Sequence, residues 1–140
     1  MSKAFTKEDD AIPAAPPRRL GVPVPDPNYM TPAGAHAARI EAASCRDGER
    51  LRELTDHLAT AQVIDPPADR GEASLGALVT VADASGQRTS YRLVGALEAD
   101  ARRGRVFWQS PIGERLYGAH VGDELALPRG EVEVVAIAYE

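Results

Sequence analysis

The sequence predicts an α+β fold, in which a short antiparallel helical hairpin is followed by a small antiparallel β-sheet with one further helix. Between residues 32 and 64, apolar residues recur every three or four positions, which is the spacing of amphipathic helices. From Gly76 onward the period changes to two, and glycine or proline turns separate short apolar runs, which is typical of strands. Helices and antiparallel strands that occupy separate parts of a chain define the α+β class.

Length and charge restrict the function classes. The chain has 140 residues, enough for a modest core, and no apolar run approaches the roughly 20 residues that span a bilayer, so we expect a cytoplasmic protein without a membrane partner. The net charge is −5, with acidic and basic residues interspersed. Because nucleic-acid binding normally requires clustered Lys and Arg, we expect no direct sequence-specific contact with nucleic acid. We also expect no cofactor and no bound metal.

Residues 1–27 are predicted to form an extended, proline-rich tail. Six of these residues are proline, at positions 13, 16, 17, 23, 25 and 27. Proline lacks a backbone N–H and biases the preceding residue toward extended backbone, so neither a helix nor a central strand persists there. We interpret the tail as an inert extension, although Phe5 and Leu20 could dock on the body or on a partner.

Residues 28–67 are predicted to form the helical hairpin. Thr31 can cap a first helix over residues 32–44, and Asp47 can cap a second one, which Asp65 and two prolines end. A turn of three to five residues joins the two helices. The expected apolar positions are Ala33, Ala37, Ile40 and Ala43 in the first helix and Leu51, Leu54, Leu58 and Ala61 in the second, which Val63 and Ile64 continue outward.

Two histidines and one cysteine lie in the predicted hairpin. His36 and His57 have polar neighbours and no second metal ligand at i+4, so we expect both histidines to be exposed. Cys45 is the lone cysteine, which excludes an internal disulfide and a cysteine-based zinc site. Since no nearby His and Asn or Asp pattern would activate it, we interpret Cys45 as an ordinary thiol.

Residues 68–140 are predicted to form the sheet domain. Strands are expected over residues 77–81, 89–94, 106–108, 124–127 and 132–139, with turns at 83–86 and 128–130. A short helix opened by Pro111 covers one face of this sheet and ends near Tyr117. The expected apolar face contains Val79, Val81, Leu93, Val106, Val121, Leu125, Val134 and Ile137.

Four motifs of this domain resemble one protein family. They are YRLVG at residues 91–95, EAD at 98–100 and SPIGERLYGAHVGDE at 110–124, followed by IAY at 137–139. Together they resemble the C-terminal region of the GreA/GreB transcript-cleavage factors. The resemblance extends from about residue 28 to residue 139 and is strongest from Gly76 onward. So many spaced matches are specific, whereas a lone SP or VGD would carry no weight.

The resemblance implies an FKBP-like C-terminal domain that binds the rim of the secondary channel of bacterial RNA polymerase. It also implies a helical arm that enters the channel. In cleaving members this arm carries acidic residues at its tip, which help to hold a second magnesium ion. We expect the polymerase contacts to be made by Ser110, Pro111, Ile112, Glu114 and Arg115. For Ser110 and Pro111 there is a simpler interpretation, the capping of a small helix, and both residues could fill both roles.

The arm of this chain is shorter than the family pattern. About 14 helical residues reach only roughly 20 Å at 1.5 Å per residue, and cleaving members need several more turns. Asp47 and Glu49 are candidate catalytic acids at the tip, but we favour capping and a favourable position at a helix N-terminus. The short arm is similar to that of the Rnk subgroup, described as nucleoside diphosphate kinase regulators, and Ser2 to Asp10 resemble the opening of a GreB-like proteobacterial subgroup.

We therefore predict a monomeric, non-enzymatic regulator that binds RNA polymerase without stimulating transcript cleavage. Two alternatives are an active cleavage factor that uses Asp47 and Glu49, and a regulator of nucleoside diphosphate kinase. Prolyl isomerase activity is a further alternative that an FKBP-like fold suggests. We disfavour it because a fold does not by itself imply an activity.

Overall fold

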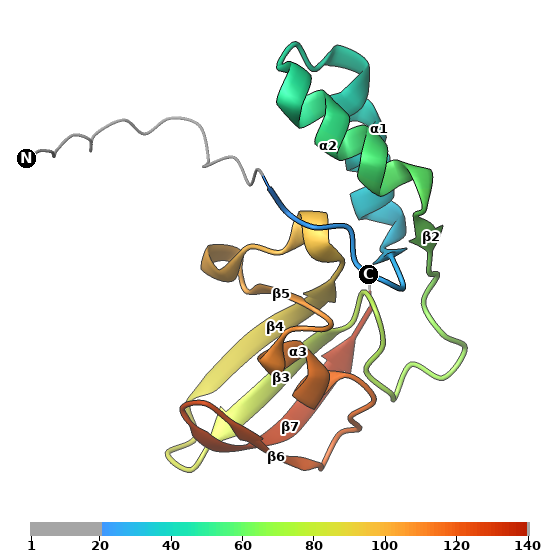
Figure 1. The fold of residues 1–140 in the computed structure, drawn as a ribbon. Coiled ribbons are helices and arrows are strands. Elements are labelled where there is room, and N and C mark those ends of the chain that lie inside the picture. The colour runs from blue at the N-terminus through green and yellow to red at the C-terminus, as the bar shows by residue number, and fades with distance from the viewer. Residues whose placement is uncertain (1–20, 140) are drawn as a thin grey trace, which may run out of the picture.

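A computed structural model describes residues 21–139, so residues 1–20, with Phe5, Leu20 and the first three prolines of the predicted tail, lie outside the described part. The structure confirms the α+β class. A helical hairpin projects from one end of a twisted five-stranded sheet (Figure 1). None of the helices in the described part is long and apolar enough to cross a membrane.

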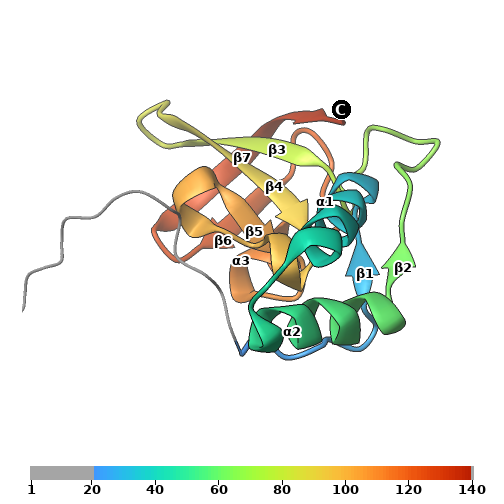
Figure 2. The same ribbon diagram turned by 90° about the horizontal axis from the view of Figure 1, so that it is seen from above.

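The hairpin consists of α1 (Pro32–Ser44) and α2 (Gly48–Ala59), which a three-residue turn connects. α1 begins as predicted, because the Thr31 Oγ1 atom accepts a hydrogen bond from the Gly34 N–H at 2.9 Å and Pro32 occupies the first turn. Seen from above, the two helices lie side by side, next to the sheet rather than on it (Figure 2).

The predicted buried face of α1 is wrong. The helix buries Ala35 and Ala38, whereas Ile40 remains 57% exposed and Ala33 and Ala37 face outward. α1 is alanine-rich around much of its circumference, so apolar spacing does not single out one side. In the hairpin the side that packs closely is lined by small residues, and the larger Ile40 is left at the surface.

Two short strands at the base of the hairpin were not predicted. β1 (Tyr29–Met30) pairs in parallel with β2 (Gln62–Val63), and the Gln62 N–H donates to the Asn28 carbonyl oxygen at 2.8 Å. α2 therefore ends at Ala59, earlier than the helical spacing of Val63 and Ile64 suggested. This pairing closes the base of the arm, where α1 starts and α2 stops.

The main sheet has the strand order β5-β4-β3-β7-β6. Its strands are β3 (Leu78–Asp83), β4 (Arg88–Val94), β5 (Arg105–Phe107), β6 (Glu124–Leu127) and β7 (Gly130–Ala138). The expectation of a purely antiparallel sheet is wrong at one edge, because β4 and β5 pair in parallel. Two short 3₁₀ turns, η2 (Ala96–Glu98) and η3 (Ala101–Arg103), form the crossover that a parallel pair needs.

The core lies between the sheet and α3 (Pro111–Leu116), the predicted small helix. Most of the expected apolar face is buried or packed against the buried cluster, which includes Val79, Val81, Leu93, Leu116 and Val134. Val121 is an exception and is 57% exposed. It lies in the loop after α3, directly before Gly122, whose φ of +98° turns the chain away from the core.

Candidate functional site

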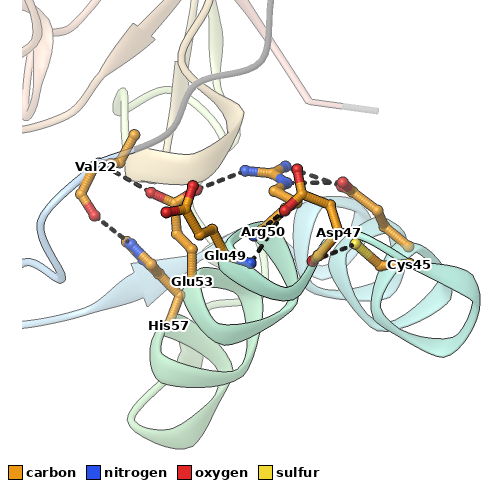
Figure 3. Close-up of polar contacts among 8 residues, drawn as sticks. Val22, Cys45, Asp47, Glu49, Arg50, Glu53 and His57 are labelled. Carbon is orange, nitrogen blue, oxygen red and sulfur yellow. Dashed lines mark hydrogen bonds and ion pairs between the residues drawn. The ribbon is translucent and has the colours of Figure 1, made fainter.

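The arm tip carries the two candidate catalytic acids, Asp47 and Glu49. The Asp47 Oδ1 atom accepts hydrogen bonds from the backbone N–H groups of Glu49 at 3.0 Å and Arg50 at 3.4 Å, so Asp47 is the N-cap of α2 (Figure 3). Glu49 is exposed in the first turn of the helix. The Cys45 thiol is partly exposed and donates to the Asp47 carbonyl oxygen at 3.4 Å. These contacts are those of a capped helix start.

An arginine ties the two helices together just behind the tip. The Arg50 guanidinium binds both carboxylate oxygens of Glu41 on α1, at 2.7 and 2.9 Å, and Glu53 on α2 at 2.9 Å. The hydrogen bond to Glu41 is the main reason why the pKa of Arg50 is raised above its ordinary value. A bidentate pair of this kind fixes the spacing of the helices more firmly than a single exposed ion pair.

Residues 21–28, which we call the strap, lie against α2. The Val22 N–H donates to Glu53 Oε2 at 2.7 Å, and the Val22 carbonyl oxygen accepts from His57 Nε2 at 2.9 Å (Figure 3). At the other end, the Asn28 side-chain amide donates to the His57 carbonyl oxygen at 2.7 Å. Residues 21–27 of the predicted tail are therefore packed on the arm, and the hydrogen bonds of Val22 hold them there.

The strap corrects the prediction that His57 is exposed. Its side chain is 1% exposed, whereas His36 faces solvent as expected. Because the Val22 oxygen can only accept, His57 Nε2 carries the proton, and Nδ1 is buried without a hydrogen-bond partner among the described residues. The neighbours of His57 in sequence are polar, but the strap, about 30 to 35 positions earlier, covers it.

Residues 110–115, which we call the α3 segment, hold the predicted polymerase contacts. The Ser110 Oγ atom accepts from the Gly113 N–H at 3.0 Å, so Ser110 is the N-cap of α3, and Pro111 follows it in the first turn. Gly113 is buried against the end of β5, where an added Cβ atom would lie 2.1 Å from the Phe107 carbonyl oxygen. α3 therefore rests directly on the backbone of β5.

The rest of the α3 segment is divided between core and surface. Ile112 is half-buried against the core cluster, whereas Pro111, Glu114 and Arg115 are exposed. The Arg115 Nη1 atom donates to the Ala126 carbonyl oxygen at 3.1 Å, which links the helix to β6. Beside them is an open hollow of about 260 Å³, lined by Pro111, Arg115, Ala126, Leu127 and Pro128.

Gly95 and Glu98 contact the arm, which the sequence did not predict. Gly118 and Gly122 have positive φ values, which favour glycine, whereas Gly95 has an ordinary φ of −79°. An added Cβ atom at Gly95 would lie 2.5 Å from the Tyr29 carbonyl oxygen of the arm. The Glu98 side chain also contacts the arm, at the start of α1. The YRLVG and EAD motifs drew attention to these positions, but their spacing did not reveal a contact with residues 29–34.

The described residues contain one group that could hold a metal ion, formed by Asp69, Glu72 and His120. One ligand atom from each lies within 4.8 Å of the others, and all three side chains are exposed. The group joins the segment before β3 to the loop after α3 and does not include the tip acids. Exposed groups of this kind are common on protein surfaces without an ion, so we assign no metal to it.

The family model "Transcription elongation factor, GreA/GreB, C-term" matches residues 68–139. The transcription elongation factor GreA of Sphingopyxis alaskensis is 38% identical over 100 residues, covering 67% of this chain and 63% of that protein. GreA of Paracoccus denitrificans is 39% identical over 109 residues, covering 74% and 69%. A solved GreA/GreB structure from Nitrosomonas europaea, 23% identical, aligns with a TM-score of 0.47 over 80% of this chain and 98% of that one.

Proposed function

Because the chain belongs to the GreA/GreB transcription elongation factor family, we propose that it binds bacterial RNA polymerase and regulates elongation without stimulating transcript cleavage. The chain spans 63% of the length of the Sphingopyxis relative. The proposed contact is between the α3 segment and the rim of the secondary channel, with the helical arm directed into the channel. In this position a monomer of the protein would hinder other factors that enter the same channel.

The surface around α3 supports the docking part of the proposal. Pro111, Glu114 and Arg115 are exposed on one short helix, next to the 260 Å³ hollow. An apolar side chain of a partner could enter this hollow, while the two charged residues select the orientation of the partner. Ser110 and Ile112 would then hold the segment in shape, because one caps the helix and the other packs against the core.

The length of the arm is the observation that carries the non-cleaving part. α1 and α2 have 13 and 12 residues, which at 1.5 Å per residue corresponds to about 20 Å. Metal-assisted hydrolysis requires carboxylates that reach the metal and the attacking water. The Asp47 carboxylate is instead occupied as the N-cap of α2. A short arm whose tip acid has a structural role favours obstruction of the channel over chemistry inside it.

The docking part is tested by binding to core RNA polymerase. We expect the parent chain to bind at micromolar concentration or below, and the charge reversal Glu114→Arg with Arg115→Glu to abolish retention. The matched control is Arg88→Glu, an exposed arginine at the start of β4 that should leave binding unchanged. No retention of the parent chain, or retention of nucleoside diphosphate kinase instead, would overturn the proposal.

The non-cleaving part is tested on a stalled, backtracked elongation complex. We expect no release of short 3′ RNA fragments when the protein is added, although it should compete with a cleaving factor for the complex. Fragment release that disappears in the Asp47→Ala, Glu49→Ala double variant would establish the alternative, an active cleavage factor.

A further inference from the structure

We propose that Glu98 is a positioning residue that holds the helical arm at one fixed angle to the C-terminal domain. The junction, which we call the elbow, consists of Tyr29, Thr31 and Gly34 on the arm and Gly95, Glu98 and Trp108 on the domain. Its contacts join residues that are about 65 to 80 positions apart. This inference deepens the proposed function, because a blocking arm must point in a defined direction, but the elbow itself can be tested without polymerase.

A chain of hydrogen bonds crosses the elbow. The Gly34 N–H donates to Thr31 Oγ1 at 2.9 Å, and the Thr31 hydroxyl in turn donates to Glu98 Oε1 at 2.7 Å. The other carboxylate oxygen of Glu98 accepts longer bonds of 3.4 Å from the Thr31 and Gly95 N–H groups. Hydrogen bonds to a carboxylate are stronger than neutral ones, and linked bonds polarise one another.

Glu98 also supplies the charge that the start of α1 lacks. The first turn of α1 contains no acidic residue, although a negative charge is favourable at a helix N-terminus. The Glu98 carboxylate, which comes from η2 of the other domain, lies at this position. A rotation of the arm would therefore separate Thr31, the N-cap of α1, from the Glu98 carboxylate. Within residues 21–139, this is the only carboxylate that is hydrogen-bonded to Thr31.

The steric fit of the elbow leaves little freedom. An added Cβ atom at Gly34 would lie 2.1 Å from Glu98 Cδ, so the carboxylate rests directly on the helix backbone. At Gly95 an added Cβ atom would lie 2.5 Å from the Tyr29 carbonyl oxygen. The Tyr29 ring in turn stacks on Trp108, with the ring centroids 5.0 Å apart. The arm is thus held at two places, the start of α1 against Glu98 and Tyr29 against Gly95 and Trp108. A rotation of the arm about either contact would disturb the other one.

The test measures the direction of the arm in the whole 140-residue chain. Cys45, the lone cysteine, lies at the arm tip and takes one spin label, and Glu131→Cys, at an exposed position of β7, takes the second. We expect one narrow distance distribution. Glu98→Ala should raise the fraction of molecules outside it by about tenfold or more, which corresponds to about 1.4 kcal/mol. Glu98→Gln, whose amide oxygen can still accept from Thr31, should retain most of the narrow distribution.

A second pair of variants separates positioning from general stability. Gly34→Ala should broaden the distribution as Glu98→Ala does, because the new methyl group would push the flexible Glu98 carboxylate away from Thr31. In the double variant Gly34→Ala, Glu98→Ala the two effects should not add, because both changes remove the same contact with Thr31. Glu124→Ala, an exposed glutamate on β6, is the matched control and should change nothing.

The proposed role of Glu98 is overturned if Glu98→Ala leaves the distance distribution of the folded protein unchanged. It is also overturned if the distribution of the parent chain is as broad as that of the variant. A folded protein with a fixed arm that fails to bind polymerase would overturn the proposed function alone. Should Gly34→Ala not fold, the comparison of Glu98→Ala with Glu98→Gln decides the question.

Discussion

The substitution Gly113→Ala tests whether α3 rests directly on the backbone of β5. The new Cβ atom would lie 2.1 Å from the Phe107 carbonyl oxygen and 2.9 Å from the Trp108 Cα atom. These are backbone atoms, which cannot rotate aside as a flexible side chain can. Overpacking costs about 1–3 kcal/mol, and we expect the upper end here. Alanine recovers up to about 1 kcal/mol of helix propensity relative to glycine, which leaves a net loss of roughly 2 kcal/mol.

For a chain of this size, a loss of 2 kcal/mol lowers the melting temperature by roughly 8 °C. Thermal unfolding followed by circular dichroism measures it, and urea unfolding gives the free energy independently. Gly48→Ala is the matched control, since Gly48 is also in the first turns of a helix but has no atom within 4 Å of its added Cβ. Its melting temperature should be equal to or slightly above that of the parent chain. If Gly113→Ala melted together with the parent chain, the close seating of α3 would be refuted.

Two further predictions concern the strap and the β3–β4 turn. His57→Ala should destabilise the protein by roughly 2–4 kcal/mol in urea unfolding, because it leaves a buried cavity. It should also speed proteolysis within residues 21–28, because the hydrogen bond to Val22 is lost. Unchanged proteolysis would contradict the packing of the strap on α2. The Ser85 hydroxyl and the Ser85 and Gln87 N–H groups donate to Asp83 and lower its pKa below the ordinary 3.8. The stabilisation of the folded state by these hydrogen bonds is therefore complete above about pH 3.8. It is lost as the pH falls through the lower pKa that Asp83 has in the folded protein, and NMR titration of the Asp83 carboxyl measures this pKa. A midpoint at or above 3.8 would be inconsistent with these bonds.

The elements that the sequence predicted well have local causes. Thr31 and Ser110 start their helices through side-chain bonds to the residue three positions later, and each precedes a proline. The Asp83 turn is likewise held by donors within four residues. Such bonds depend on short sequence patterns, so residue type and spacing are enough to predict them.

The elements that the sequence did not predict depend on distant partners. His57 is covered by a strap from about 30 to 35 positions earlier, and the parallel pairing of β4 with β5 depends on how two 3₁₀ turns fold back. The same is true of the candidate site. The sequence located the α3 segment, but the contact between Glu98 and Thr31 joins residues 67 positions apart. No local periodicity encodes such a contact.

These separations also bear on the order in which the molecule assembles. The strap, the ion pairs of Arg50 and the β1–β2 pairing all join residues within about 35 positions, so the arm has a low contact order and should form early during synthesis. The pairing of β3 with β7 joins Leu78 to Ala138 and requires nearly the whole chain. Glu98 can bind Thr31 only after the crossover between β4 and β5 has folded. We therefore expect the arm to form first and to acquire its direction later, when the domain made after it folds.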